Sequence, residues 1–152
     1  MKIGENAPDF TLKDGEGNDW KLSEQRGKIV VLLFYPGDDT PVCTKQMCSV
    51  RDNWEDYKAT GAEVVGISTD SAESHKNFAG KYDLPLTLLA DENGETLEKY
   101  DMKSWLPNRA ARGVVVIDKN GKIAYHKAQA LSLLRPKDDE ILQAIEKAQN
   151  VG

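Results

Sequence analysis

The sequence of 152 residues has little of several features that mark specialised protein classes. Its charges nearly balance, with 20 Lys and Arg against 25 Asp and Glu, so no basic excess is present to bind nucleic acid or an anionic membrane. No apolar run approaches the ~18 residues that a membrane-spanning helix needs. No repeat, low-complexity tract or linker interrupts the chain, which predicts a single domain over residues 1–152.

Cysteine is also scarce, since the chain has only Cys43 and Cys48. Two cysteines close together do not make the disulfide framework of a small secreted protein. The N-terminus has no apolar segment of the kind that forms a signal peptide, so the default expectation is a cytoplasmic protein. A close cysteine pair in such a domain indicates redox chemistry or a metal site.

Hydrophobic patterning predicts an α/β fold in which helices flank a mixed central β-sheet. The predicted strands are residues 10–12, 20–22, 29–35, 64–68, 86–89, 114–117 and 123–125. The first two and the last two flank turn-rich segments and are expected to form hairpins. The predicted helices run from Pro41 to about Lys58, from Asp70 to Tyr82, over 95–100, and from Pro136 towards the C-terminus.

The most informative segment carries both cysteines, where the strand 29–35 is followed by a helix. Thr40 is a favoured N-cap residue and Pro41 a favoured first helical residue, so Cys43 is expected in the first helical turn. The backbone N–H groups of that turn lack partners inside the helix, and together with the helix dipole they stabilise an anion. We therefore expect Cys43 to be a thiolate nucleophile rather than a small buried hydrophobe.

The separation between Cys43 and Cys48 restricts how they react with each other. Cα atoms five residues apart on an ideal α-helix are about 8.6 Å apart. A disulfide tolerates only about 4.4–6.8 Å between the same atoms. Either the two sulfurs never bond, or the first turns of the helix unwind when they do. In the second case the thiolate meets its oxidant in the folded helix and the other cysteine in the unwound one.

The pattern Pro36-x-x-x-Thr40-x-x-Cys43 resembles the peroxidatic motif of the peroxiredoxins. With Cys48 five residues further on, the segment resembles the bacterioferritin-comigratory-protein (peroxiredoxin Q) subfamily, whose resolving cysteine lies at that distance. The likeness runs nearly from end to end. It includes residues 4–12, 46–52, 71–78 and 84–91.

This resemblance implies a thioredoxin-like fold with an N-terminal β-hairpin, and a thiol peroxidase that serves antioxidant defence. Cys43 would reduce hydrogen peroxide or an organic hydroperoxide and become a sulfenic acid, which Cys48 would convert to an intramolecular disulfide. Thioredoxin or a similar dithiol donor would then reduce that disulfide. No cofactor or metal is implied, and the expected form is a monomer or a weak dimer.

The resemblance also implies that a threonine, an arginine and backbone amides surround the peroxide, in a loop that begins at Pro36. Thr40 matches the threonine, and its hydroxyl is expected to accept a helical N–H while donating to the peroxide. Arg112 is the expected arginine, because a strand 114–117 antiparallel to 29–35 would begin beside the cysteine loop. Arg109 is the alternative. A fixed guanidinium would stabilise the charge that grows on the leaving oxygen.

The remaining polar and aromatic candidates are expected to be structural. The predicted places are the apolar face of a helix for His75, the surface for His126 and a turn for Asp38 and Asp39. Asp70 and Glu73 stand at capping-box spacing before the helix that carries His75. Trp105 and Leu106 precede Arg112 and are candidates for shaping substrate access.

Two other functions compete with the peroxidase hypothesis. A thioredoxin-like oxidoreductase normally carries C-x-x-C, whereas four residues separate the cysteines here. A metal or copper carrier would use Cys43, Cys48 and a histidine, but a structural zinc site wants four protein ligands, and the two histidines are far apart in the chain. Consumption of hydrogen peroxide separates the three.

Overall fold

The computed structural model describes residues 2–104, 108–129 and 138–149. Its strands are β1 (Thr11–Asp14), β2 (Asp19–Lys21), β3 (Val30–Phe34), β4 (Glu63–Ser68), β5 (Thr87–Ala90), β6 (Arg112–Ile117) and β7 (Ile123–Gln129). Its helices are α1 (Pro41–Asp52), α2 (Trp54–Ala59), α3 (Ala72–Tyr82), α4 (Glu95–Lys99) and α5 (Asp138–Gln149), with a 3-10 turn at Leu22–Gln25. The strands form one sheet in the order β2-β1-β5-β4-β3-β6-β7, so the predicted mixed sheet is confirmed.

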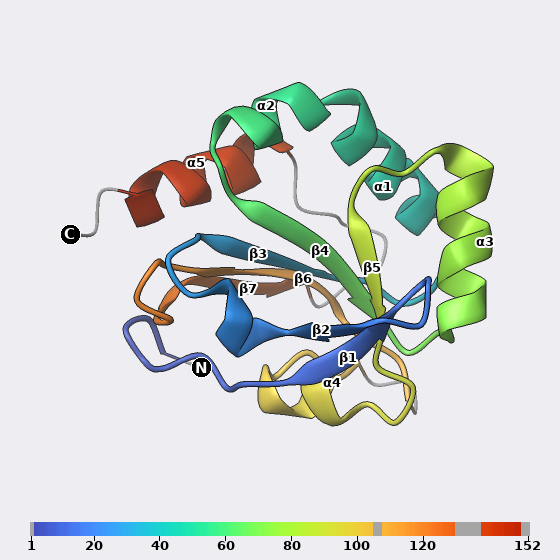
Figure 1. Cartoon of the computed structure of the whole chain (residues 1–152), viewed down its shortest axis with the longest axis horizontal. Coiled ribbons are helices and arrows are strands. Elements are labelled where there is room, and N and C mark those ends of the chain that lie inside the picture. The colour runs from blue at the N-terminus through green and yellow to red at the C-terminus, as the bar shows by residue number, and fades with distance from the viewer. Residues whose placement is uncertain (1, 105–107, 130–137, 150–152) are drawn as a thin grey trace.

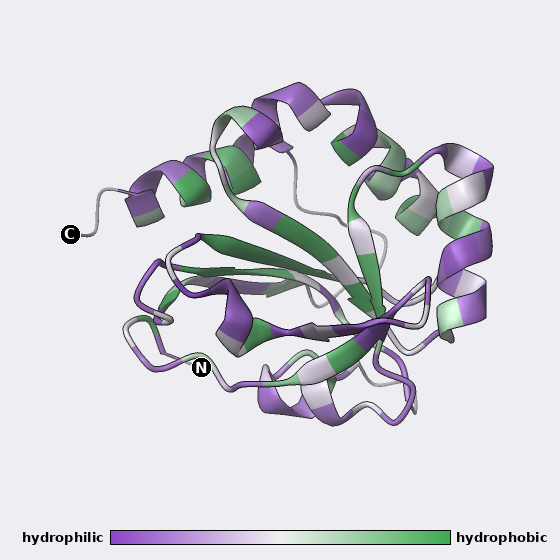
Figure 2. Cartoon of the chain, in the orientation of Figure 1, coloured by the Kyte–Doolittle hydropathy of each residue, from purple (hydrophilic) through white to green (hydrophobic). Residues whose placement is uncertain are grey.

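The sheet is the middle layer of the molecule, and helices cover it unequally (Figure 1). Alternate side chains of β3 point to opposite faces, as they must in a strand. Val31 and Leu33 belong to the core under α1, α2, α3 and α5. Leu32 and Phe34 belong to the opposite core, which Leu97 of α4 helps to close. Figure 2 shows the hydrophobic colour concentrated in the central strands, as expected for a sheet buried on both faces.

The central pairings bring residues far apart in sequence to one end of β3. β3 is parallel to β4 and antiparallel to β6, with Phe34 paired with Gly113. Arg112, the first residue of β6, therefore lies just beyond the end of β3, where the chain leads into α1. Gly113 must be a glycine, because a Cβ atom there would lie 2.6 Å from Met102 Sδ and 2.7 Å from the Lys127 carbonyl oxygen.

Two helical predictions were wrong in detail. The helix expected from Pro41 to about Lys58 is divided at Asn53, whose side-chain Nδ2 donates to the Ser49 carbonyl at 2.9 Å and which adopts a non-helical ψ of 18°. The N-cap of α3 is Ser71, whose hydroxyl accepts the Ser74 N–H, rather than Asp70. In both cases a short polar side chain bonds to the backbone at the boundary: the Asn53 amide shares the Ser49 carbonyl with the Asn53 N–H, and the Ser71 hydroxyl caps Ser74.

The last helix agrees with its predicted inward face over the part that is described. In α5, Ile141, Ile145 and Ala148 are buried, and Leu142 is partly buried against the same core. The predicted start at Pro136 lies outside the described residues. Within the described ranges, no helix has both the length and the apolar composition that a membrane crossing requires.

Candidate active site

Cys43 lies in the first turn of α1, as the spacing from Thr40 predicts. Its side chain is completely buried, which the sequence did not predict. Arg112 Nη2 donates to its sulfur at 3.0 Å, and Nη1 of the same guanidinium donates to Gln46 Oε1 at 2.7 Å. Arg112 is only 2% exposed, so solvent barely screens its charge. The buried guanidinium and the N–H groups of the first helical turn thus supply positive charge beside the sulfur.

Arg109, the alternative arginine, lies near the loop but not at the sulfur. Its Nη1 donates to the Pro36 carbonyl at 3.4 Å and lies 3.8 Å from Asp70 Oδ1, and its side chain is 48% exposed. Of the two arginines, Arg112 is therefore the one that the structure brings to Cys43. Pro36 contributes its carbonyl oxygen to the same loop.

Thr40 occupies the predicted N-cap position, since its carbonyl accepts the Thr44 N–H at 2.8 Å. The expected side-chain cap is absent. The hydroxyl instead donates to the Gly37 carbonyl at 3.2 Å, within the loop. The prediction that this hydroxyl accepts a helical N–H is thus wrong, because the side chain is hydrogen-bonded to the Gly37 carbonyl and not to the first turn of α1. Thr40 is exposed, so its hydroxyl is accessible to a small substrate.

Cys48 lies in the second half of α1 and is partly buried. Both cysteines are free, and the helix runs unbroken between them. The intact helix therefore keeps the Cα atom of Cys48 about 8.6 Å from the Cα atom of Cys43, a separation that a disulfide cannot span. A bond between the two sulfurs requires α1 to unwind.

The loop before α1 contains a buried polar cluster that the sequence did not reveal. Asp38 was expected to be a turn residue only, yet its side chain is 4% exposed and accepts three hydrogen bonds. The donors are the Tyr35 hydroxyl at 2.7 Å, the Ser74 hydroxyl at 2.8 Å and His75 Nδ1 at 2.8 Å. The signal available in the sequence was the place of Asp38 inside the Pro36–Thr40 motif together with a histidine on an apolar helix face.

The electrostatics of the cluster follow from this arrangement. Burial raises the pKa of Asp38, but the hydrogen bond and positive charge of His75 and the bonds from Tyr35 and Ser74 outweigh it, so the net shift of this pKa is downward. Burial and the neighbouring Asp38 charge raise the pKa of Tyr35 well above its ordinary value. The carboxylate is therefore ionised and the phenol neutral at physiological pH.

Other predicted placements had mixed outcomes. His126 is not at the surface: it is half-buried in β7, with Nε2 2.8 Å from the Tyr100 carbonyl oxygen. Trp105 and Leu106 lie outside the described residues. Among the residues that the structure describes, no group of three His, Cys, Asp or Glu side chains could hold a metal ion, so the metal-carrier alternative has no ligand set there.

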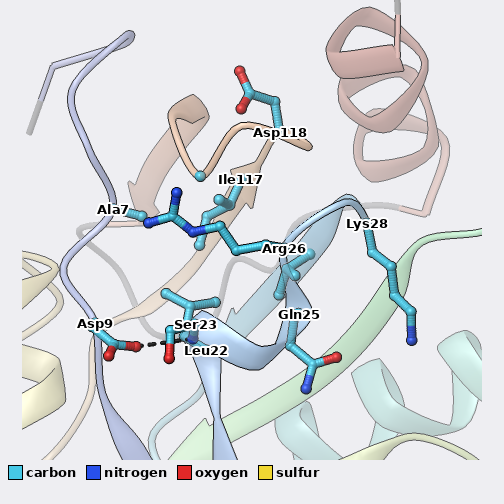
Figure 3. Close-up of a pocket in the computed structure, with 11 residues that line it drawn as sticks. Ala7, Asp9, Leu22, Ser23, Gln25, Arg26, Lys28, Ile117 and Asp118 are labelled. Carbon is cyan, nitrogen blue, oxygen red and sulfur yellow. Dashed lines mark hydrogen bonds between the residues drawn. The ribbon is translucent and has the colours of Figure 1, made fainter.

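A separate hollow lies at the opposite end of β3 (Figure 3), lined by Val30 and by its partner Ile117 of β6. Arg26 extends along it, and the Asp9 carboxylate accepts the Ser23 N–H at 3.0 Å. Its volume is about 90 Å³. Pockets for small organic ligands measure roughly 300–1,000 Å³, so this hollow is too small for one.

Comparison with known proteins agrees with this geometry. The family model described as "AhpC/TSA family" matches residues 3–126. The chloroplastic peroxiredoxin Q of Sedum lineare is 52% identical over 124 residues, which are 79% of this chain and 65% of that protein. The chloroplastic peroxiredoxin Q of Triticum aestivum is 50% identical over 126 residues, 80% of this chain and 57% of that protein. This chain thus spans less than two thirds of the length of these curated relatives.

Solved structures give the same result for the fold. The structure of peroxidoxin BcpB from Mycobacterium tuberculosis superposes with a TM-score of 0.85 at 30% identity, covering 100% of this chain and 99% of that one. The reduced 2-Cys peroxiredoxin of Plasmodium vivax gives a TM-score of 0.88 at 25% identity, covering 98% of this chain and 97% of that one. The thioredoxin-like fold expected from the sequence is confirmed.

Proposed function

Because the chain belongs to the AhpC/TSA family, in which its relatives are peroxiredoxins, we propose that it is a thiol-dependent peroxidase acting on hydrogen peroxide and organic hydroperoxides. The observation that supports this most directly is the 3.0 Å contact between Arg112 Nη2 and Cys43 Sγ in a buried site. It supplies a nucleophile and a fixed positive charge at the same point, which is what displacement at a peroxide oxygen needs.

In the first step the Cys43 thiolate attacks the terminal oxygen of ROOH. A sulfur–oxygen bond forms, the oxygen–oxygen bond breaks, and both electrons of that bond leave on the RO⁻ group. Cys43 is oxidised to a sulfenic acid, and RO⁻ takes a proton from solvent to give an alcohol, or water when R is hydrogen. Arg112 and the N–H groups of the first helical turn are the donors that stabilise the charge on the separating oxygens. The Thr40 hydroxyl joins them when its single proton turns from the Gly37 carbonyl to the peroxide.

In the second step Cys48 attacks the sulfenic sulfur, giving a Cys43–Cys48 disulfide and releasing water. This is the atypical 2-Cys scheme, and it requires α1 to unwind. Thioredoxin or a similar dithiol donor then reduces the disulfide by exchange and becomes oxidised itself. The chloroplastic names belong to the relatives. The cytoplasmic location and the monomeric or weakly dimeric state of this chain stay predictions.

The test is stopped-flow mixing of reduced protein with hydrogen peroxide, followed by turnover with excess dithiol. Wild type should consume peroxide catalytically, and Cys43→Ser should consume none above the buffer rate, because serine is not ionised at neutral pH. A fast phase that survives in Cys43→Ser would contradict the assignment. Reduction of insulin disulfides without peroxide would instead indicate a general thiol–disulfide oxidoreductase.

A further inference from the structure

His75 is a fully buried ring whose two nitrogens both face oxygen atoms. Nε2 lies 2.9 Å from the Leu89 carbonyl oxygen of β5, and Nδ1 lies 2.8 Å from Asp38 Oδ2. A carbonyl oxygen only accepts hydrogen bonds, so Nε2 must carry a proton. The contact at Nδ1 needs a second proton, located between the ring and the carboxylate.

The neighbours of Asp38 decide which partner holds that second proton. Its Oδ1 accepts from the Tyr35 hydroxyl at 2.7 Å, and its Oδ2 also accepts from the Ser74 hydroxyl at 2.8 Å. Donors that converge on one carboxyl group stabilise its ionised form more than its acid form, because a carboxylate is the stronger acceptor. The downward pKa shift of Asp38 agrees with ionisation. The ring is then an imidazolium ion, paired with Asp38 inside the protein.

The loop that Asp38 belongs to does not hold its own shape. Asp39 has a φ of 60°, a left-handed conformation that residues with a side chain seldom adopt unless their surroundings impose it. The Asp38 N–H donates to Asp70 Oδ2 at 2.7 Å, and the Thr40 hydroxyl donates back to Gly37. The side chains that hold Asp38 from outside the loop therefore include Asp70 and His75 of α3, and of these two His75 is the one that is fully buried.

We propose that His75, as a buried imidazolium paired with Asp38, is a positioning residue for the peroxide-binding loop, fixing Thr40 relative to Cys43. This inference rests on the proposed peroxidase function. With the pair in place, Asp39 is kept left-handed and Thr40 stands at the start of α1. Without it, Asp39 relaxes to an ordinary φ, and the N-cap residue that faces the substrate moves. His75 touches neither substrate nor sulfur and acts through Asp38. Its Nδ1 also lies 3.3 Å from the Tyr35 hydroxyl, which donates to the same carboxylate.

Rates of the two chemical steps test the inference. His75→Gln should slow oxidation of Cys43 by hydrogen peroxide by on the order of tenfold to a hundredfold, because small misplacements of a catalytic group cost that much. Disulfide formation after oxidation should change by less than about threefold, since Cys48 lies outside the loop and unwinding removes the geometry that His75 maintains. General destabilisation of the fold would slow both steps, so a slower rate in the first step alone would indicate a positioning role.

A matched control uses a second contact between α3 and the same loop. Lys81 Nζ lies 3.1 Å from Asp39 Oδ1, but both side chains are more than half exposed. Lys81→Gln should therefore leave the peroxide rate unchanged, because exposed ion pairs contribute little. A wild-type peroxide rate in folded His75→Gln would overturn the inference, as would equal slowing in Lys81→Gln.

Ring nitrogen spectroscopy gives an independent test on the wild-type protein. The ¹⁵N signals of His75 at neutral pH should show both nitrogens protonated, and Asp38→Asn should convert the ring to a neutral tautomer. A neutral ring in the wild type would overturn the ion pair whether or not any variant folds. If the wild type failed to consume peroxide, the proposed function would fall, and the imidazolium signature would still report on the pair alone.

Discussion

The two halves of helix α1 are held in different ways, although each carries one cysteine. In the first half, Cys43 and Gln46 are buried and both contact the Arg112 guanidinium. In the second half, Cys48 is partly buried, and the next residue, Ser49, donates to Asp138 at the start of α5. Asp138 also accepts from Asn53 Nδ2 at 3.2 Å.

The difference lies in what each contact requires. The bond from Arg112 to sulfur is strongest while the sulfur is an anion. Once Cys43 becomes a sulfenic acid that negative charge is gone, so oxidation itself weakens the hold on the first half of the helix. The contacts of Asp138 do not depend on the oxidation state of either cysteine. In the proposed cycle, oxidation would therefore loosen the half of α1 that carries Cys43, while the contacts of Asp138 keep the other half attached.

The largest change in rate should come from Arg112→Ala, which removes the contact that the guanidinium makes with the first half of α1. Oxidation of Cys43 should slow by one to several powers of ten, because a well-placed donor stabilises a transition state by roughly 2.7–4 kcal/mol. Arg112→Lys should recover little, since lysine lacks the planar fork that reaches Cys43 and Gln46 together. Stopped-flow rates against peroxide concentration measure both.

The matched control is Arg109→Ala, which removes the exposed arginine three residues away. It contacts the Pro36 carbonyl and Asp70 rather than the sulfur, so its loss should change the rate by less than about tenfold. A crippling effect of Arg109→Ala, with Arg112→Ala unaffected, would place the substrate-binding cation in the loop instead of in β6.

The next largest change should come from replacing Cys48, in the second half of α1. Cys48→Ser should reduce about one equivalent of peroxide per chain at near wild-type speed, then stop as a sulfenic acid and drift to sulfinic acid in excess peroxide. Mass spectrometry follows each species. In the wild type, formation of the disulfide should accelerate amide exchange over residues 41–49, and equal protection in both redox states would show that α1 does not unwind.

A smaller effect is expected from titrating Asp38. The pKa of this carboxyl is lower in the folded chain than its ordinary value of 3.8, chiefly because His75 outweighs the cost of burial. A lowered pKa adds stability that is present above the unfolded value and is lost as the pH falls through the folded one. The stability difference between wild type and Asp38→Asn should therefore shrink between neutral pH and about pH 3 in urea unfolding experiments. A constant difference would contradict the charge argument.

The smallest effect should come from Asp138→Asn, which keeps the shape of the contact with the second half and removes its charge. Hydrogen bonds to charged groups contribute about 1.5–3 kcal/mol, and a neutral acceptor retains part of that. Disulfide formation should therefore accelerate by a few-fold, while the first peroxide step stays unchanged. Quenched-flow alkylation of free thiols measures the second step, and slower disulfide formation would mean that Asp138 assists unwinding rather than opposing it.

The sequence predicted those parts of the molecule that depend on local patterns. The apolar run at β3 and the turn at Asn120-Gly121 gave the strands and the last hairpin, and the spacing from Thr40 gave the place of Cys43. Arg112 was favoured because residues 112–118 resemble the arginine and following strand of the peroxiredoxins. The antiparallel pairing with β3 that would bring its start beside the loop is observed.

What the sequence did not reveal depends on contacts between distant segments. The pairing of Asp38 with His75 joins residues 37 positions apart. The motif around Asp38 and the apolar helix face around His75 mark each residue, but they do not show that the two residues meet. Asn53 divides the predicted long helix because its amide finds acceptors on Ser49 and on Asp138, 85 residues away. Helix propensity depends on the local sequence and contains no information about such distant partners.

The pairing of β3 with β6 also determines when the chain becomes reactive during its synthesis. Arg112 and Cys43 are 69 residues apart, and the ladder that joins them includes Phe34 and Gly113. A growing chain that has not yet reached β6 carries its cysteine without the guanidinium. Contacts of such long range also form late in folding, because loop closure must precede them. The guanidinium therefore reaches the sulfur only once β6 has paired with β3, so the site around Cys43 belongs to the completed sheet and not to the segment that carries both cysteines.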